Sequence, residues 1–234
     1  TAGVTIASAV YKNGPLKAQL WDYYAHDIAN SIYGDVNYNI NTGGDLKPFV
    51  AAQFIKQVDV GDNIIQNSAL GGTGEMEGFY AAAKIGAKYK GFTAYVAYSQ
   101  TSQNNAGDNT YENAIVTTFG GMPAYTQGMV TRHQFLAGTD AAKIVGAYSF
   151  KNHGVNMSAS AYYSTFDMDE NSGYGIARTA TEPGFDIQYY PASVKNLQLR
   201  FRGNFPRKFA QSTGATAVDR KSTRLNPVTV RSRM

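Results

Sequence analysis

A period of two in hydrophobicity constrains this chain more than any other feature of its sequence. The pattern is clearest over residues 78–98, where apolar side chains occupy every second position and small or polar ones lie between them. The apolar row comprises Phe79, Ala81, Ala83, Ile85, Ala87 and Tyr89, then Phe92, Ala94, Val96 and Tyr98 after the turn at Lys90-Gly91. Since successive side chains of a β-strand point to opposite faces, this row predicts strands whose two faces meet different surroundings.

The same alternation recurs along the chain and predicts ten strands. We expect them at residues 3–11, 16–26, 31–41, 47–58, 75–89, 92–102, 142–151, 155–166, 184–190 and 196–205. Short connections alternate with long ones, and the long ones are residues 59–74, 103–141 and 167–183. Short turns at one rim and long loops at the other are typical of outer-membrane barrels, whose strands need roughly 9 to 11 residues to cross the hydrocarbon layer. The predicted fold class is therefore all-β, an antiparallel up-and-down transmembrane β-barrel.

Composition favours this reading over a soluble domain. Charged residues make up 16% of the chain, below the roughly 25% of soluble proteins, and the apolar rows contain Ala, Gly and Tyr rather than large aliphatic residues. No apolar run approaches the roughly 18 residues of a transmembrane helix. The alternative is a soluble β-rich ligand-binding protein or a surface adhesin. The row from Phe79 to Ala87 discriminates: it faces outward from a single curved sheet in a barrel, and packs against a second sheet in the alternative.

Aromatic residues gather near the expected strand ends, where an interfacial girdle of a membrane barrel would lie. They are Tyr11, Trp21, Tyr38, Tyr89, Phe92, Tyr148, Tyr189 and Tyr190.

Enzymatic and metal-dependent functions find little support. The chain has no cysteine, which excludes a thiol nucleophile, and His26, His133 and His153 are scattered without metal-ligand spacing. No two carboxylates are paired for acid and base chemistry. We therefore expect no catalytic residues, no metal, no cofactor and no enzyme activity.

The last sixteen residues break every preceding pattern. Residues 219–226 (DRKSTRLN) read as a translated short-read sequencing adapter, and the similarity resumes at residues 232–234. Residues 219–234 carry five basic residues and one acidic residue, so removing them leaves sixteen of each sign and takes the net charge from +4 to zero. Nucleic-acid binding then has no basis in charge. We expect residues 1–218 to form a partial barrel and residues 219–234 to be a non-native tail.

Several segments resemble the OprD family of bacterial substrate-specific outer-membrane porins. The similar segments are residues 13–24 (NGPLKAQLWDYY), 27–30 (DIAN), 120–125 (GGMPAY), 175–190 (GIARTATEPGFDIQYY) and 195–202 (KNLQLRFR). The resemblance covers residues 1 to about 209. It implies an eighteen-stranded barrel in the bacterial outer membrane, in contact with lipid, of which these ten strands are the later ones. It also implies passive diffusion of small hydrophilic solutes that bear carboxylates, anionic or zwitterionic.

The resemblance further implies a ladder of basic side chains along the inner wall. Arg200 and Arg202 match the family's paired arginines on the penultimate strand, and their parity places them on the lumen face. An arginine fork can bind a carboxylate through two hydrogen bonds. Lys84 and Lys88 share the inward face of their strand and extend the ladder, unless they are simple polar filler. Lys56 has ambiguous parity and is left unassigned, as is Lys143.

The long segment 103–141 is expected to be functional because loops of this length seldom lack a role. By resemblance it folds into the channel and helps to form the constriction. The candidate residues are Gly121, Met122, Pro123, Tyr125 and Arg132. The alternative is a loop that caps the outside of the barrel.

Overall fold

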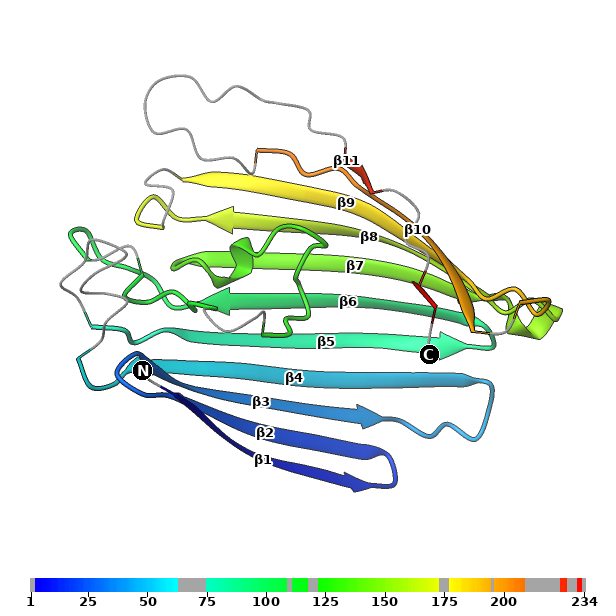
Figure 1. Cartoon of the computed structure of the whole chain (residues 1–234), viewed down its shortest axis with the longest axis horizontal. Helices are drawn as coiled ribbons and strands as arrows, with labels where there is room; N and C mark the ends of the chain where they lie inside the picture. Colours follow the sequence, from blue (N-terminus) through cyan, green and yellow to red (C-terminus); the bar gives the residue numbers. More distant parts are fainter. Residues whose placement is uncertain are drawn as a thin grey trace.

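The chain forms one antiparallel sheet in which every long strand pairs with its neighbours in the sequence, as the computed structural model shows (Figure 1). The structure describes residues 3–62, 75–108, 111–117, 122–172, 177–194, 196–208, 224–226 and 231–232. The long strands are β1 (Val4–Asn13), β2 (Leu16–Ala25), β3 (Ala29–Asn39), β4 (Leu46–Asp59), β5 (Phe79–Tyr89), β6 (Phe92–Thr101), β7 (Thr139–Ser149), β8 (Met157–Met168), β9 (Arg178–Tyr189) and β10 (Leu197–Asn204). Two 3-10 turns, η2 (His133–Phe135) and η3 (Phe150–His153), flank β7.

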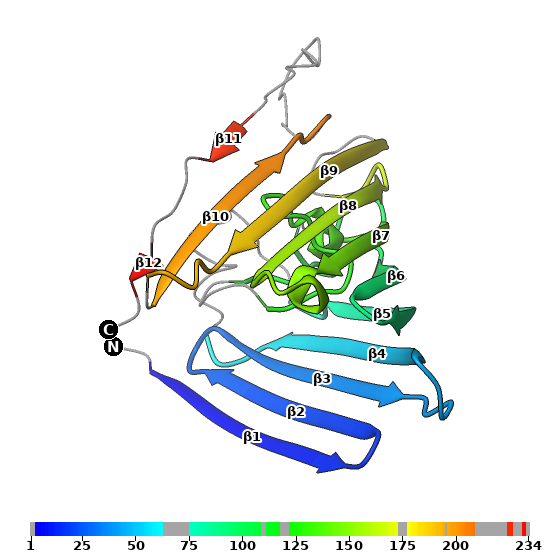
Figure 2. The ribbon, with the colours of Figure 1, turned by 90° about the vertical axis from the view of Figure 1, so that its right-hand side faces the viewer.

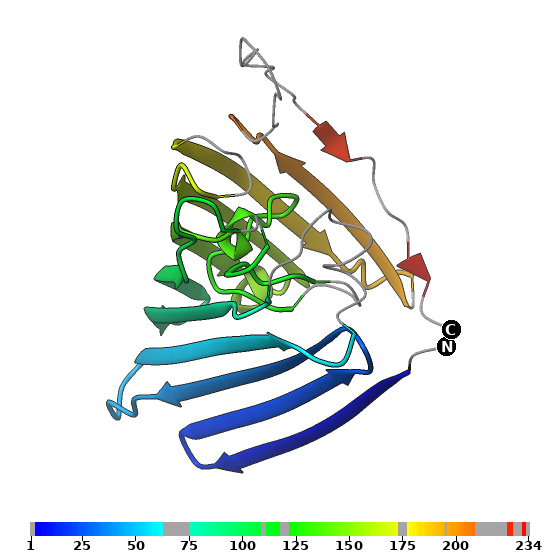
Figure 3. The same cartoon turned by 90° about the vertical axis from the view of Figure 1, so that its left-hand side faces the viewer.

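The sheet curves into an open arc when it is viewed along its strands (Figures 2 and 3). We call the connection between β6 and β7, residues 102–138, the β6–β7 loop; its described residues, 102–108, 111–117 and 122–138, lie on the concave side of this arc. The expected row on β5 and β6 faces the convex side, where Ile85 is 59% exposed and Val96 49% exposed. All strands of the described part of the chain belong to this one sheet, so the row packs against no second sheet there. The barrel-type fold is confirmed, and the sandwich alternative is not supported.

All ten predicted strands are present, and the largest error concerns β9. The sequence analysis placed residues 167–183 in a loop and began the strand at Gly184, but β9 begins at Arg178. The Pro183 carbonyl accepts a hydrogen bond from Phe205 N at 2.9 Å, and the backbone pairing continues beyond it to Thr181 and Arg207. The strand therefore loses only the single N–H that proline lacks. Similarly, β5 begins at Phe79 rather than Glu75, and β7 begins at Thr139 rather than Ala142.

The expected aromatic girdle is present at the end of the sheet that carries the short turns. Tyr89, Phe92 and Tyr148 are direct register neighbours on the convex face, and Tyr11, Tyr38 and Tyr189 are exposed at the same end of their strands. Two assignments were wrong. Trp21 packs against the buried cluster on the concave side, and Tyr190 donates and accepts hydrogen bonds with glutamines there.

The buried core lies inside the arc. Its main cluster joins Tyr33 of β3, Ile55 of β4 and Tyr80 of β5 to Ile115 and Phe135 of the β6–β7 loop. Tyr80 and Phe135 meet edge to face, with ring centroids 5.2 Å apart. The concave face is thus packed by the chain's own loop, whereas the convex face is apolar and exposed. The described helical segments are single turns, none of them long or apolar enough to cross a membrane.

The short strands β11 (Arg224–Asn226) and β12 (Arg231–Ser232) both pair with β10. The division of the chain at residue 218, with a non-native tail beyond it, stays a prediction.

The convex face predicts a one-sided response to charge. Ile144 lies near the middle of β7 on the convex face and is 57% exposed. In a lipid bilayer, Ile144→Arg should lower the free energy of unfolding by about 2–4 kcal/mol, the cost of an arginine near the bilayer midplane. Urea titration of the complete barrel in vesicles measures this cost. Ser160→Arg on the concave face is the matched control, and an equal loss from both substitutions would contradict the assignment of the faces.

Candidate functional site

Two rows of side chains cross the concave face, as defined by the strand register. The first row runs from Lys12 and Lys17 through Lys84 and Lys143 to Glu182. The second row runs from Lys47 and Lys88 through Asp186 to Arg202. The rows are four residues apart along each strand, or about 13 Å at the usual strand rise. Each row therefore carries several cations and a single carboxylate.

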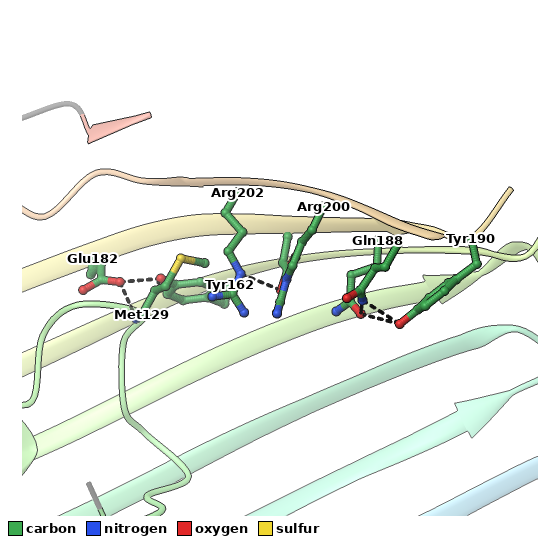
Figure 4. A network of polar contacts seen from close by, with 9 residues as sticks. Met129, Tyr162, Glu182, Gln188, Tyr190, Arg200 and Arg202 are labelled. Carbon is green, nitrogen blue, oxygen red and sulfur yellow. Dashed lines mark hydrogen bonds and ion pairs between the residues drawn. The ribbon is translucent and has the colours of Figure 1, made fainter. Parts of the chain in front are cut away.

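Arg200 and Arg202, which project from β10 (Figure 4), both bind Asp186, the register partner of Arg202 on β9. Arg200 donates from Nε to Oδ1 and Oδ2 at 2.9 and 3.1 Å, and from Nη2 to Oδ2. Arg202 donates only from Nε, to Oδ2 at 3.1 Å. Among the described residues, the two Nη groups of Arg202 have no partner. The trio keeps a net charge of +1, and among the described residues Arg202 has two open Nη groups whereas Arg200 has one, Nη1.

A strip of uncharged polar groups continues from these arginines toward the short turns (Figure 4). Gln198 Nε2 donates to the Tyr190 hydroxyl at 2.6 Å and to Gln188 Oε1 at 3.1 Å. The polar surface of β9 and β10 therefore extends beyond the charged trio.

Lys84 and Lys88 share the concave face of β5, as predicted, but their surroundings differ. The Lys84 ammonium lies 4.1 Å from the ring centroid of Tyr125 and within 6 Å of the rings of Tyr95 and Phe49. Such contacts are typical cation–π interactions. Lys88 is exposed and approaches only the Phe49 ring, at 5.9 Å. Lys84 thus holds the β6–β7 loop, and Lys88 is the more accessible cation.

Two glutamines of β4 bind the backbone of the β6–β7 loop. Gln53 donates to the Pro123 carbonyl at 2.7 Å and accepts from the Tyr125 N–H at 2.9 Å. Gln57 makes the equivalent pair of bonds with Val116, at 2.9 and 2.7 Å. A buried loop lacks the partners that a sheet provides, and each side-chain amide here satisfies one donor and one acceptor. The glutamines therefore allow the loop to lie against the wall.

The middle of the loop is attached through hydroxyl groups. The Tyr125 hydroxyl donates to the Asp35 carboxylate of β3, and Thr126 Oγ1 lies 2.7 Å from Ser99 Oγ of β6. Burial, reinforced by the bond to Asp35, raises the pKa of Tyr125, so its phenol stays protonated and remains a donor.

The most heavily bonded attachment is at Glu182 of β9, whose side chain is fully buried. Its carboxylate accepts from the backbone N–H groups of Met129 at 2.5 Å, Val130 at 3.3 Å and Thr131 at 2.9 Å. It also accepts from the hydroxyl groups of Thr131, at 2.7 Å, and Tyr162. Lys143 Nζ donates to the Gln127 carbonyl at 2.5 Å and lies 4.6 Å from the Tyr162 ring centroid.

The predicted loop residues have different positions. Gly121 lies outside the described residues. Met122 packs against the cluster of Tyr33, Ile55 and Tyr80, while Pro123 is exposed and contributes its carbonyl. Tyr125 contacts β3 through Asp35 and β5 through Lys84. Arg132 is exposed at the residue before η2, and no ion pair of the described residues involves it.

The sequence analysis missed Asp35, Gln53, Gln57, Lys143 and Glu182. Lys143 had no clear parity, and the structure places it on the concave face; Lys56 faces the opposite way. Glu182 was missed because residues 167–183 were predicted to be a connection, whereas β9 begins at Arg178. In the described part of the chain, no three His, Asp or Glu side chains are placed to hold a metal ion.

No protein-family model and no curated protein matches the chain. Solved structures do. A BenF-like porin from Pseudomonas fluorescens Pf-5 is 18% identical, with a TM-score of 0.70 over 89% of this chain and 51% of that one. Pseudomonas aeruginosa OpdK with vanillate is 14% identical, with a TM-score of 0.66 over 88% and 51%. P. aeruginosa OccK8 (OprE) is 15% identical, with a TM-score of 0.67 over 86% and 53%. The chain spans about half the length of these structures, and it has the fold of OprD-type porins.

The close packing of the loop around Glu182 predicts that a larger residue at Gly128 destabilises the fold. A Cβ at this position would lie 2.4 Å from Thr131 Oγ1 and 2.5 Å from Glu182 Oε2. Gly128→Ala should therefore reduce the free energy of unfolding by about 1–3 kcal/mol, as overpacking does. Denaturant titration of the complete barrel measures it. In the control Gly146→Ala, the new methyl meets only Phe92 Cζ, at 4.0 Å. Equal free energies of unfolding for the two variants would contradict the close packing of the loop around Glu182.

Proposed function

We propose that the chain is the later part of an OprD-type porin of the bacterial outer membrane, a passive channel for small hydrophilic solutes and not an enzyme. The observation that carries the proposal is the contrast between the two faces of one curved sheet. The convex face is apolar, exposed and bordered by aromatic residues, as a wall in lipid requires. The concave face is polar and charged, and its own loop narrows it. The fold shared with solved porins supports this function.

The proposed mechanism is electrostatic filtering. Cations along the two rows of the concave face raise the local concentration of anionic groups, and the loop limits the size of what passes. Since a channel must release its solute, no site should bind tightly. Besides the solute, the proposed partner is outer-membrane lipid, which would cover the exposed convex face.

A carboxylate is the solute group that the concave face suits best. The first row sets four lysines against Glu182, whose carboxylate is already fully bonded, and the second sets two lysines and Arg202 against Asp186. A structure of OpdK contains vanillate, which is itself a carboxylate. We therefore propose anionic or zwitterionic carboxylates as the solute class.

Arg202 is the arginine that meets the solute in this account. Arg200 uses Nε and Nη2 to bind Asp186 and keeps only Nη1, whereas Arg202 uses only Nε and keeps both Nη groups for a passing carboxylate. A planar guanidinium can bind such a group through two parallel hydrogen bonds. Asp186 then holds both arginines in position and weakens their electrostatic attraction for the solute, so that the solute can leave.

Charge reversal tests the basic surface directly. In the complete barrel in planar bilayers, the double variant Arg200→Glu/Arg202→Glu should shift the reversal potential in a salt gradient toward cation selectivity. The cause is the loss of two lumen cations and the gain of two lumen carboxylates.

The matched control is Lys90→Glu/Lys151→Glu, an equal change of charge at two exposed residues of the short turns. Asp186→Asn changes the lumen charge in the opposite direction, because it removes a carboxylate, and should therefore increase anion selectivity. A reversal potential that responds equally to the arginine and control variants would remove the arginines from the ion pathway.

A further inference from the structure

The carboxylate of Glu182 is bound in a way that differs from every other contact between the β6–β7 loop and the wall. Three successive backbone N–H groups, at residues 129, 130 and 131, point at one side chain, and the Thr131 hydroxyl joins them. Converging N–H groups of this kind form an anion-binding concavity, and here a charged side chain of the chain itself fills it. The attachments through Gln53, Gln57 and Ser99 are uncharged on both sides, and the other loop-binding carboxylate, that of Asp35, accepts a single hydroxyl from the loop, Tyr125.

The loop and the wall each depend on this contact for hydrogen-bond partners. The loop itself buries Glu182 and supplies most of its donors, so the carboxylate would have to exchange these donors for water of the channel if the loop left. Residues 129–131 would in turn lose the acceptor of three N–H groups. Tyr162 strengthens the contact from both sides, since its hydroxyl donates to Glu182 and accepts from the Met129 N–H at 3.0 Å. Lys143 secures the preceding residue by bonding to the Gln127 carbonyl.

The contact also fixes a distance that matters for passage. Glu182 and Asp186 lie on the same face of β9, four residues apart, and Asp186 binds the two arginines. At the usual strand rise, this spacing is about 13 Å. The loop segment at Met129 is therefore held a set distance along the wall from Arg202.

We propose that Glu182 is a positioning residue, a latch that holds residues 128–131 of the β6–β7 loop against β9 and thereby sets the width of the passage beside the arginines. The proposal rests on the porin function, because it assigns the latch a role in conduction. Loosening the latch should let the loop leave the wall while the ten strands stay folded. The channel would then fluctuate between open levels.

The central test is Glu182→Gln in the complete barrel. Glutamine keeps the shape but loses the charge and places an NH2 donor against the N–H groups of the loop. Single-channel recordings should show a several-fold rise in open-channel current noise.

Asp186→Asn is the matched control, because it removes the same charge from the same face of β9 at a residue that the described loop residues do not contact. It should alter ion selectivity without raising the noise. Noise in Glu182→Gln equal to that of the wild type would overturn the latch.

A disulfide provides the rescue. Ser99 and Thr126 join β6 to the loop with oxygens 2.7 Å apart, and the chain has no cysteine of its own. In the Glu182→Gln background, Ser99→Cys/Thr126→Cys should restore quiet currents when oxidised and lose them on reduction with dithiothreitol. Noise that persists after the disulfide has formed would show that it does not arise from the loop, and would also overturn the proposal.

Trypsin separates failure of the latch from failure of the porin function. Arg132 is the only lysine or arginine between residues 102 and 138, and it is exposed next to the latch. Cleavage after Arg132 should be several-fold faster in Glu182→Gln than in the wild type, whether or not the protein conducts. If Glu182→Gln does not fold, Tyr162→Phe removes one bond to the latch and should raise the cleavage rate less. A wild type that forms no channel would contradict the porin function, and unchanged cleavage in both variants would contradict the latch.

Discussion

Opposite surroundings on the two faces of a single sheet determine the rest of this structure. The ladder satisfies the backbone of the ten strands, so the side chains alone decide what each face can meet. On β5 to β7 the convex positions are Ala, Gly, Phe, Ile, Val and Tyr, apart from Gln100 and Asp140 at the ends of β6 and β7 that border the long loop, while the concave ones include Lys84, Lys88 and Lys143. A membrane wall with a polar interior needs this division, because charge on the lipid side is costly. A one-residue slip in register would exchange the two faces of a strand.

The concave face in turn explains how a loop of this length can be buried. Its backbone must find hydrogen-bond partners away from the ladder, and the wall supplies them from β4 and β9, through Gln53, Gln57 and Glu182. Aromatic packing around Tyr80 and Phe135 adds apolar contact beneath these bonds. The charged groups are therefore divided between two tasks. Lys84, Lys143 and Glu182 hold the loop, whereas Lys88 and Arg202 remain open to the interior.

The period-two pattern predicted the strands well because it is local and depends on each strand's own two faces. It also placed Arg200 and Arg202 on the correct face. It failed at Glu182, because residues 167–183 were predicted to be a connection; Gly184 makes room for the Tyr162 ring, 2.5 Å from where a Cβ would lie. The loop contacts could not be predicted from the sequence, because they join the loop to residues far from it in the chain, such as Asp35 and Glu182. No local sequence pattern indicates such pairs. The resemblance predicted an inward loop but could not supply its anchors.

Accessibility of alternate residues along β7 tests the division of the two faces most directly. Since the chain has no cysteine, single cysteines at residues 142 to 147 of the complete barrel can be exposed in membranes to a charged, membrane-impermeant thiol reagent. The account predicts that positions 143, 145 and 147 react and that positions 142, 144 and 146 do not, because thiols in hydrocarbon rarely ionise. Uniform reactivity, or the reverse alternation, would contradict a wall with lipid on its convex face and water on its concave one.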